Sequence, residues 1–115
     1  MNELGSLAAE IAAFRDERDW KQFHNPKDVA LSLVLEAAEL LEIFQWKQED
    51  AVQRAAVEQK DRIAEELADV FYYALLLAHD QRIDLAEALR AKLKVNGLKY
   101  PIEKARGSSK KYTEL

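Results

Sequence analysis

Two pairs of carboxylates stand at a spacing that would let them act together. Glu36 and Glu39 lie within LEAAELLEIF, and Glu66 and Asp69 lie within EELADVFYY. Each pair is three residues apart, and residues i and i+3 lie on the same side of an α-helix. The apolar residues that fall within roughly 60° of Glu36 on such a helix are Val29, Leu33, Leu40 and Ile43. The sequence therefore predicts that Glu36 points into an apolar stripe.

Carboxylates on an apolar face need compensation. Burying one unpaired carboxylate costs several kcal/mol, and converging carboxylates repel one another. Arg62 is the only basic residue aligned with Asp69, so a hard divalent cation such as Mg²⁺, which binds oxygen ligands and substrate phosphates, is the simplest compensator. The alternative is a solvated helix surface, because E-x-x-E also arises by chance, and spacing alone leaves both interpretations open. A di-iron site would need Glu-x-x-His pairs, which His24 and His79 do not supply.

Aromatic and basic residues form a second group of candidates. Trp20, Phe23, His24 and Trp46 stand at or beyond helix ends, where they would sandwich a planar base or, as the sequence alone favours, form a hydrophobic cap or subunit interface. Near the end of the last long helix, Lys92, Asn96 and Lys99 share one side. They would hold triphosphate oxygens or simply complement the helix dipole. Arg106, Lys110 and Lys111 add positive charge in the tail and are open to the same two interpretations. The sequence contains no Gly-rich phosphate loop and no nucleophile motif, which points to metal-assisted attack by water.

Composition narrows the class of protein. The chain has 115 residues, a net charge of −4 and no cysteine. This acidic balance argues against a nucleic-acid-coating surface, and the lack of cysteine excludes disulfides and thiolate metal sites. No stretch approaches 18 consecutive apolar residues, and the N-terminus lacks a signal-peptide pattern. We expect a cytoplasmic protein that binds neither nucleic acid nor membrane.

Helical periodicity with few breaks predicts one all-α domain over residues 1–115, an antiparallel four-helix bundle with an irregular tail over about 100–115. The first helix should run from about Glu3 to Arg18. The second, capped by Asn25 with Pro26 at its first position, should reach about Lys47. After a partly helical stretch over 48–59, the third should cover Lys60 to His79. Asp84 and Glu87 should open the fourth, which is expected to stop near Asn96-Gly97.

The chain resembles the all-α nucleotide pyrophosphohydrolases, in the MazG-like and dCTP pyrophosphatase branch. The resemblance rests on the paired carboxylate motifs and on the segments around them, and it covers the chain from about Glu17 onward. Those segments are ERDW-KQFH-NP, LVLEAAELLEIFQWK, EELADVFYY, the N-x-x-K/R-YP turn and SSKKYTEL. One departure is that some relatives carry a histidine in the first helix where this chain has Ile11.

The resemblance implies a role for each matching position. Glu36, Glu39, Glu66 and Asp69 match the family's Mg²⁺ ligands, and the resemblance implies that Mn²⁺ substitutes for Mg²⁺. The positions implied to bind the nucleoside triphosphate are Trp20, Lys21, Gln22, Phe23, His24, Trp46, Tyr73, Asn96 and Lys99. Family members commonly assemble as dimers or dimers of dimers. The nearly all-round apolar second helix agrees with such a homo-oligomer, because Leu31, Leu35 and Leu41 need cover beyond one bundle face.

The hypothesis from the sequence is Mg²⁺-dependent hydrolysis of a deoxynucleoside triphosphate, dCTP or a modified dCTP, to the monophosphate and pyrophosphate, as a step of nucleotide-pool house-cleaning. Glu39 or Glu36 is the expected general base. Two alternatives are kept. The first is a pyrophosphohydrolase for another non-standard triphosphate, and the second is a non-catalytic helical oligomer that uses the same apolar faces.

Overall fold

The computed structural model describes residues 2–115, which contain six α-helices, two short 3-10 helices and no β-strand. They form two compact units, one extending to Ile83 and the other from Asp84 to Leu115. The predicted all-α class is confirmed, with more helices than the four expected. The expectation of one domain over residues 1–115 stays a prediction.

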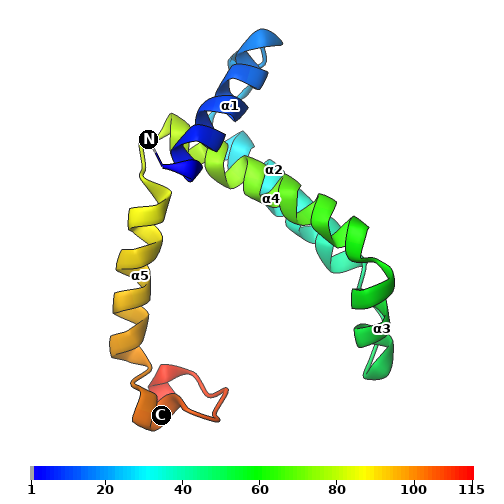
Figure 1. The fold of residues 1–115 in the computed structure, drawn as a ribbon, viewed down its shortest axis with the longest axis vertical. Helices are drawn as coiled ribbons and strands as arrows, with labels where there is room; N and C mark the ends of the chain where they lie inside the picture. The colour runs from blue at the N-terminus through cyan, green and yellow to red at the C-terminus, as the bar shows by residue number, and fades with distance from the viewer. Residues whose placement is uncertain (1) are drawn as a thin grey trace. The chain divides into compact units, whose positions relative to one another are not determined.

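Helix α4 is the spine of the first unit. The elements of this unit are α1 (Glu3–Glu17), the 3-10 helix η1 (Lys21–Phe23), α2 (Pro26–Glu42), α3 (Asp50–Glu58) and α4 (Lys60–Asp80). Helix α2 lies antiparallel along α4, and α1 and α3 also pack against α4 (Figure 1). The side chains that α2 and α4 turn toward each other therefore meet along most of their length.

Side-chain caps fix where α1 and α2 begin. The Asn2 side chain accepts a hydrogen bond of 2.7 Å from the backbone N–H of Gly5. The predicted cap at Asn25 is confirmed, because its side chain accepts from the Asp28 N–H at 2.8 Å and Pro26 follows it. Such caps satisfy backbone donors that the first helical turn leaves unpaired, each contributing about 1 kcal/mol.

The second helix ends earlier than predicted. Helix α2 stops at Glu42 rather than near Lys47, and the chain tightens through hydrogen bonds from Phe44 N to Leu41 O and from Lys47 N to Phe44 O. Trp46 and Glu49 then adopt positive φ values of 69° and 50°. Non-glycine residues rarely take this conformation, so apolar periodicity alone could not place the end of the helix.

The apolar face predicted for α2 is buried at its two ends and half-buried between them, at Leu33 and Leu40. Val29 and Ile43 are 1% and 2% exposed, and Leu76 of α4 is fully buried. Fully burying such side chains stabilises the fold by roughly 1.5–3 kcal/mol each. Glu36 shares this face and is half-buried, so the expectation that it points into the apolar stripe is confirmed.

The second unit consists of α5 (Leu85–Lys99), α6 (Ile102–Ala105) and the 3-10 helix η2 (Tyr112–Glu114). Asp84 caps α5 as predicted, accepting from the Glu87 N–H at 3.0 Å. The predicted stop near Asn96-Gly97 is wrong, because Gly97 stays helical and α5 continues to Lys99. The tail is also more ordered than expected: it forms α6 and η2, and the Lys99 ammonium lies 4.8 Å from the Tyr112 ring centroid.

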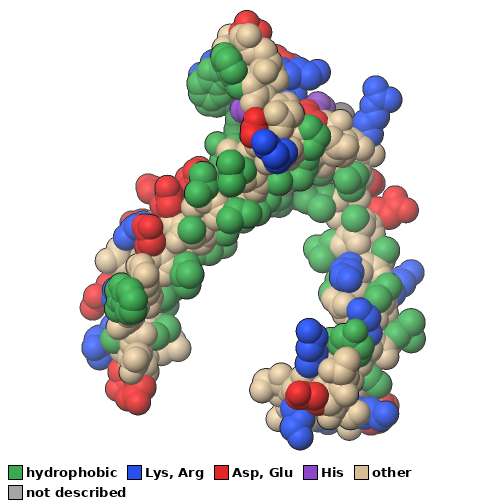
Figure 2. All heavy atoms as spheres, turned by 180° about the vertical axis from the view of Figure 1, so that it is seen from behind, with side chains coloured by type: hydrophobic (Ala, Val, Ile, Leu, Met, Phe, Trp, Pro, Cys, Tyr) green, Lys and Arg blue, Asp and Glu red, His purple; other side chains and the backbone are tan. Residues whose placement is uncertain are grey.

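Apolar side chains remain on the surface of the first unit, where Figure 2 shows a band of them along its helices. Members of this set on α2 and α4 are between 41% and 65% exposed, namely Leu31, Val34, Leu35, Leu41, Leu67 and Phe71. Exposed apolar surface of this kind marks interaction sites. Among residues 2–115, none of the helices combines the length and apolar character that crossing a membrane requires.

Candidate metal and nucleotide site

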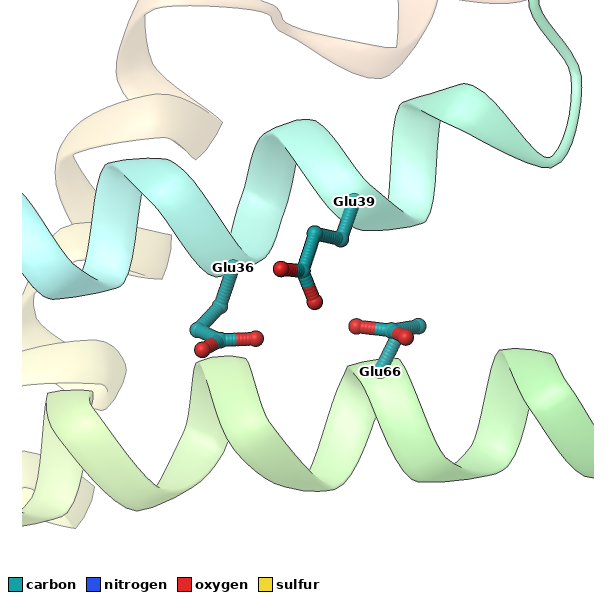
Figure 3. A group of neighbouring side chains, drawn as sticks. All are labelled: Glu36, Glu39 and Glu66. Carbon is teal, nitrogen blue, oxygen red and sulfur yellow. The ribbon is translucent and has the colours of Figure 1, made fainter.

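Three carboxylates converge between α2 and α4. Glu36 and Glu39, one helical turn apart on α2, point toward Glu66 on α4 (Figure 3). One carboxylate oxygen from each residue lies within 4.8 Å of the others. The i, i+3 spacing on α2 and the antiparallel packing against α4 together produce this convergence. The structure therefore brings three of the four predicted carboxylates together, and their role as metal ligands stays a prediction.

The cluster is electrostatically strained. Partial burial, a hydrogen bond with Glu39 and repulsion from neighbouring carboxylates raise the pKa of Glu36 above its ordinary value. Burial is also the first cause of the raised pKa of Glu66, followed by hydrogen bonding and repulsion from Glu39, while Arg62 weakly opposes the shift. Like charges held together disfavour the ionised form. The protein thus gathers negative charge here without neutralising it.

The donor set fits a hard divalent cation. All three side chains offer carboxylate oxygens, the ligands that Mg²⁺ and similar ions prefer. The Glu66 Oε2 atom is inaccessible to solvent and has no hydrogen-bond partner within residues 2–115. Buried polar atoms are normally satisfied. A cation bound between the two helices would satisfy this oxygen and relieve the repulsion.

Asp69, the fourth predicted ligand, lies beside this group rather than within it. It contributes to the raised pKa values of both Glu36 and Glu66 through its charge. Asp69 and Glu36 also line a cavity of about 530 Å³, whose other lining residues are Leu7, Glu10, Ile11, Phe14, Trp20, Tyr72 and Tyr73. Asp69 therefore connects the carboxylate cluster to an adjoining apolar and aromatic pocket.

The aromatic side chains of the pocket contact one another edge to face. The Phe14 ring lies 5.9 Å from Trp20 and 6.4 Å from Tyr72, and Tyr72 lies 4.9 Å from Tyr73. Burial raises the pKa of Tyr73, as do the nearby charges of Glu36 and Asp69. Its hydroxyl is therefore a neutral group at physiological pH. The pocket combines stacking surfaces with neutral hydrogen-bonding groups, which suits a planar base and a sugar.

An ion pair between the buried Arg15 and the half-buried Asp80 holds the helix that forms the α1 wall of the pocket. Arg15 is 1% exposed and donates a hydrogen bond of 2.7 Å from Nη1 to Asp80 on α4. At the C-cap of α1, the Arg18 guanidinium lies 3.6 Å from the Phe14 ring centroid and donates to the Phe14 carbonyl oxygen at 2.9 Å. These contacts hold the end of α1 that carries Phe14 and leads to Trp20.

Some predicted site residues lie away from this pocket. Trp20 and Tyr73 line it, whereas the residues after Trp20 do not, namely Lys21, Gln22, Phe23 and His24. Gln22 instead donates to Asp19, and Phe23 is 64% exposed. Trp46 is 90% exposed beyond the C-terminal end of α2. Asn96 and Lys99 belong to α5 in the second unit. Their binding roles stay predictions.

Several lining residues were missed as site residues by the sequence analysis. Leu7, Ile11 and Phe14 recur at i, i+4 and i+7, which predicts a buried helix face but does not tell a core face from a pocket wall. Glu10 and Tyr72 carried no signal of their own. Arg15 did carry a sequence signal. It stands four residues after Ile11, at a position where the apolar face of the helix would normally have an apolar residue. A charged residue at such a position indicates a buried partner.

Known proteins share both the sequence and the fold. A family model described as the MazG-like family matches residues 31–115. The chain is 44% identical to human dCTP pyrophosphatase 1 and 42% identical to the Bos taurus protein of that name, over all of this chain and 67% and 68% of theirs. A crystal structure of a pyrophosphatase from Archaeoglobus fulgidus superposes with a TM-score of 0.82 at 37% identity, covering 88% of this chain and 94% of that one.

The fold, the site and these relatives define the class: the chain is an all-α enzyme, a pyrophosphohydrolase. More particularly, it belongs to the MazG-like family. The resemblance inferred from the sequence is confirmed, and the alternative of a non-catalytic helical module is set aside.

Proposed function

We propose that this enzyme hydrolyses dCTP to dCMP and pyrophosphate with a divalent cation, Mg²⁺, held by Glu36, Glu39, Glu66 and Asp69. The observation that carries the proposal is the convergence of three carboxylate oxygens within 4.8 Å beside an aromatic pocket. The names of the human and bovine relatives supply the substrate. A 5-substituted dCTP fits the same chemistry.

The reaction adds water to the α-phosphorus and breaks its bond to the bridging oxygen of the pyrophosphate. A bound Mg²⁺ would neutralise phosphate oxygens and make water a better nucleophile. Glu39 or Glu36 accepts the proton that the water loses, because Glu39 is the most exposed of the three carboxylates and Glu36 faces the pocket. Trp20 and Tyr73 hold the base and sugar. Lys99 and Asn96 are proposed to contact the triphosphate.

A second copy of the chain is proposed to cover the exposed apolar band of α2 and α4. The exposure of these apolar side chains, whose band Figure 2 shows, supports a homodimer or a dimer of dimers. Light scattering coupled to size exclusion would give a mass of at least two chains. A monomer at micromolar concentration would contradict this part of the proposal.

The test of the reaction is product analysis on dCTP, 5-methyl-dCTP, dUTP, dTTP, dATP and dGTP, with Mg²⁺ or with a chelator. We expect dCMP and pyrophosphate from dCTP, strongest with the cytosine nucleotides and absent without metal. Even cleavage of all bases would keep the chemistry and overturn the cytosine preference. Release of orthophosphate, or no cleavage by folded enzyme with Mg²⁺, would overturn the proposal.

The residue assignment is tested by Glu36→Gln, with Glu42→Gln as the matched control. Glu42 lies on the same helix and is exposed, outside the cluster. Because Glu36 is proposed both to hold the cation and to border the pocket, its neutral variant should lose at least about 100-fold in kcat/KM. Full activity of Glu36→Gln with Mg²⁺ would show that the assignment is wrong.

A further inference from the structure

The nucleotide pocket contains a carboxylate that the proposed chemistry does not use. Glu10 lines the cavity from α1, together with Leu7, Ile11 and Phe14 of the same helix. It stands three residues after Leu7, so both side chains lie on one side of α1. Glu10 is also exposed to solvent. It is therefore a polar group within an otherwise apolar wall, reachable by a ligand.

The charges of the pocket indicate which part of a nucleotide it takes. The nine residues that line it include three carboxylates and no Lys, Arg or His. A triphosphate there would meet negative charge that only a bound cation could offset, and the cation site lies at the Glu36 and Asp69 side. The α1 wall is thus suited to the uncharged part of the substrate, the base.

The hydrogen-bonding capacity of the Glu10 carboxylate indicates which pyrimidine base the pocket prefers. An ionised carboxylate only accepts hydrogen bonds. Glu36 and Asp69 are assigned to the cation, which leaves Glu10 as the carboxylate of this lining that is free to accept from the base. Cytosine presents an amino donor at position 4, whereas uracil and thymine present a carbonyl oxygen there. A carboxylate facing that oxygen would repel it.

We propose that Glu10 determines base specificity by accepting a hydrogen bond from the exocyclic amino group of cytosine. This inference rests on the proposed function, since it assigns Glu36 and Asp69 to the cation and the base to the pocket. Good carboxylate-to-amino contacts discriminate between bases by a factor of ten or more. Because Glu10 is exposed, we expect about the lower end, roughly a 10-fold preference.

The experiment compares kcat/KM for dCTP and dUTP in the wild type and in Glu10→Gln. The glutamine amide both donates and accepts, so the preference for dCTP should fall about 10-fold. Glu10→Leu removes the acceptor and should lower kcat/KM for dCTP while leaving that for dUTP unchanged or higher. Glu3→Gln is the matched control, because Glu3 is exposed on the same helix and lies outside the pocket lining. It should keep the wild-type ratio.

Binding of the monophosphates separates this inference from the proposed function. Isothermal titration of dCMP and dUMP should show tighter binding of dCMP to the wild type and to Glu3→Gln, with the preference lost in both Glu10 variants. If the wild type cleaves no dCTP, the proposed function fails, and this titration still decides the role of Glu10. Unchanged dCTP to dUTP and dCMP to dUMP ratios in both Glu10 variants would overturn the inference.

Discussion

Near the C-terminal end of α4, Asp80 faces Arg15 of α1, whereas nearer the N-terminal end Glu66 faces Glu36 and Glu39 of α2. At both positions, a charged side chain of α4 is partly shielded from solvent. At the first, a guanidinium and a carboxylate of opposite charge meet at 2.7 Å, although the Arg15 Nε atom has no hydrogen-bond partner within residues 2–115. At the second, three carboxylates meet, and one oxygen of Glu66 finds no partner within residues 2–115.

With the proposed cation site, the difference would be one between a charge that stabilises the fold and a charge that binds a ligand. A pair of opposite charges stabilises the arrangement of α1 on α4 without needing any ligand, although its desolvation limits the net gain. An incomplete cluster lowers the stability of the free protein and makes that lost free energy recoverable when a cation binds. Substitutions at the two places should therefore have opposite signatures in stability and activity.

The largest expected effect is that of Glu66→Gln on turnover. Losing one carboxylate of the cluster should lower kcat/KM by at least about 100-fold. In a chelating buffer the same variant should melt at a higher temperature than the wild type, because one repelling charge is gone. The control is Glu65→Gln, whose side chain is exposed outside the cluster. A destabilised but active Glu66→Gln enzyme would reverse the comparison.

Asp80→Asn should produce the contrasting effect. Arg15 would stay buried and charged without its carboxylate, which costs about 3 kcal/mol of unfolding free energy, measured by urea unfolding with Mg²⁺ present. Asp16→Asn is the control, because Asp16 is 60% exposed and lies 3.5 Å from Arg15 Nε. Its loss should cost less than about 1 kcal/mol. Equal losses in the two variants would mean that the buried pair contributes nothing special.

Adding Mg²⁺ should stabilise the wild type, but not the variants that lack a carboxylate of the cluster. At 100 times the dissociation constant the expected gain is about 2.7 kcal/mol, read as a rise in melting temperature at constant ionic strength. Asp80→Asn should keep this gain, and Glu36→Gln should lose most of it. A gain that survives in Glu36→Gln would place the cation elsewhere.

The smallest effect concerns pH in the absence of metal. The folded-state pKa values of Glu36 and Glu66 are raised above the ordinary 4.5, so the folded protein holds protons that the unfolded chain has released. The cluster's contribution to stability is therefore fully present below about pH 4.5 and is lost as pH rises through the raised values. The difference in unfolding free energy between wild type and Glu66→Gln, followed in EDTA from pH 4 to 7, should show this fall. A difference that stays constant over this range would contradict it.

Local patterns in the sequence were enough for the helical class, the caps at Asn25 and Asp84, and the placement of Glu36 on a buried face. Each depends on residues within one or two helical turns, where periodicity and capping chemistry decide the outcome. The convergence of Glu36 and Glu39 with Glu66 depended on the packing of α2 against α4, which spacing within one helix does not determine. The dCTP pyrophosphatase resemblance then narrowed the chemistry beyond what spacing could.

The remaining features depend on contacts between distant segments or on unusual backbone conformations. Arg15 and Asp80 are 65 residues apart, and no local pattern links them. The early end of α2 involves Trp46 at a positive φ, a conformation that costs about 1–3 kcal/mol and that the surroundings must enforce. Gly97 offered a helix stop that α5 did not use, because a glycine permits the left-handed conformation without requiring it.

The length of α4 also determines whether substitutions at Glu66 and at Asp80 affect each other. Asp80 follows Glu66 by fourteen residues, which at 1.5 Å per residue places them about 21 Å apart along the axis. This separation exceeds both the range over which substitutions interact and the screening length at physiological salt, about 8 Å. Free-energy changes at the two places should therefore add. Directed evolution could strengthen the α1 anchor as a thermostability module while selection on metal affinity proceeds separately on the same helix.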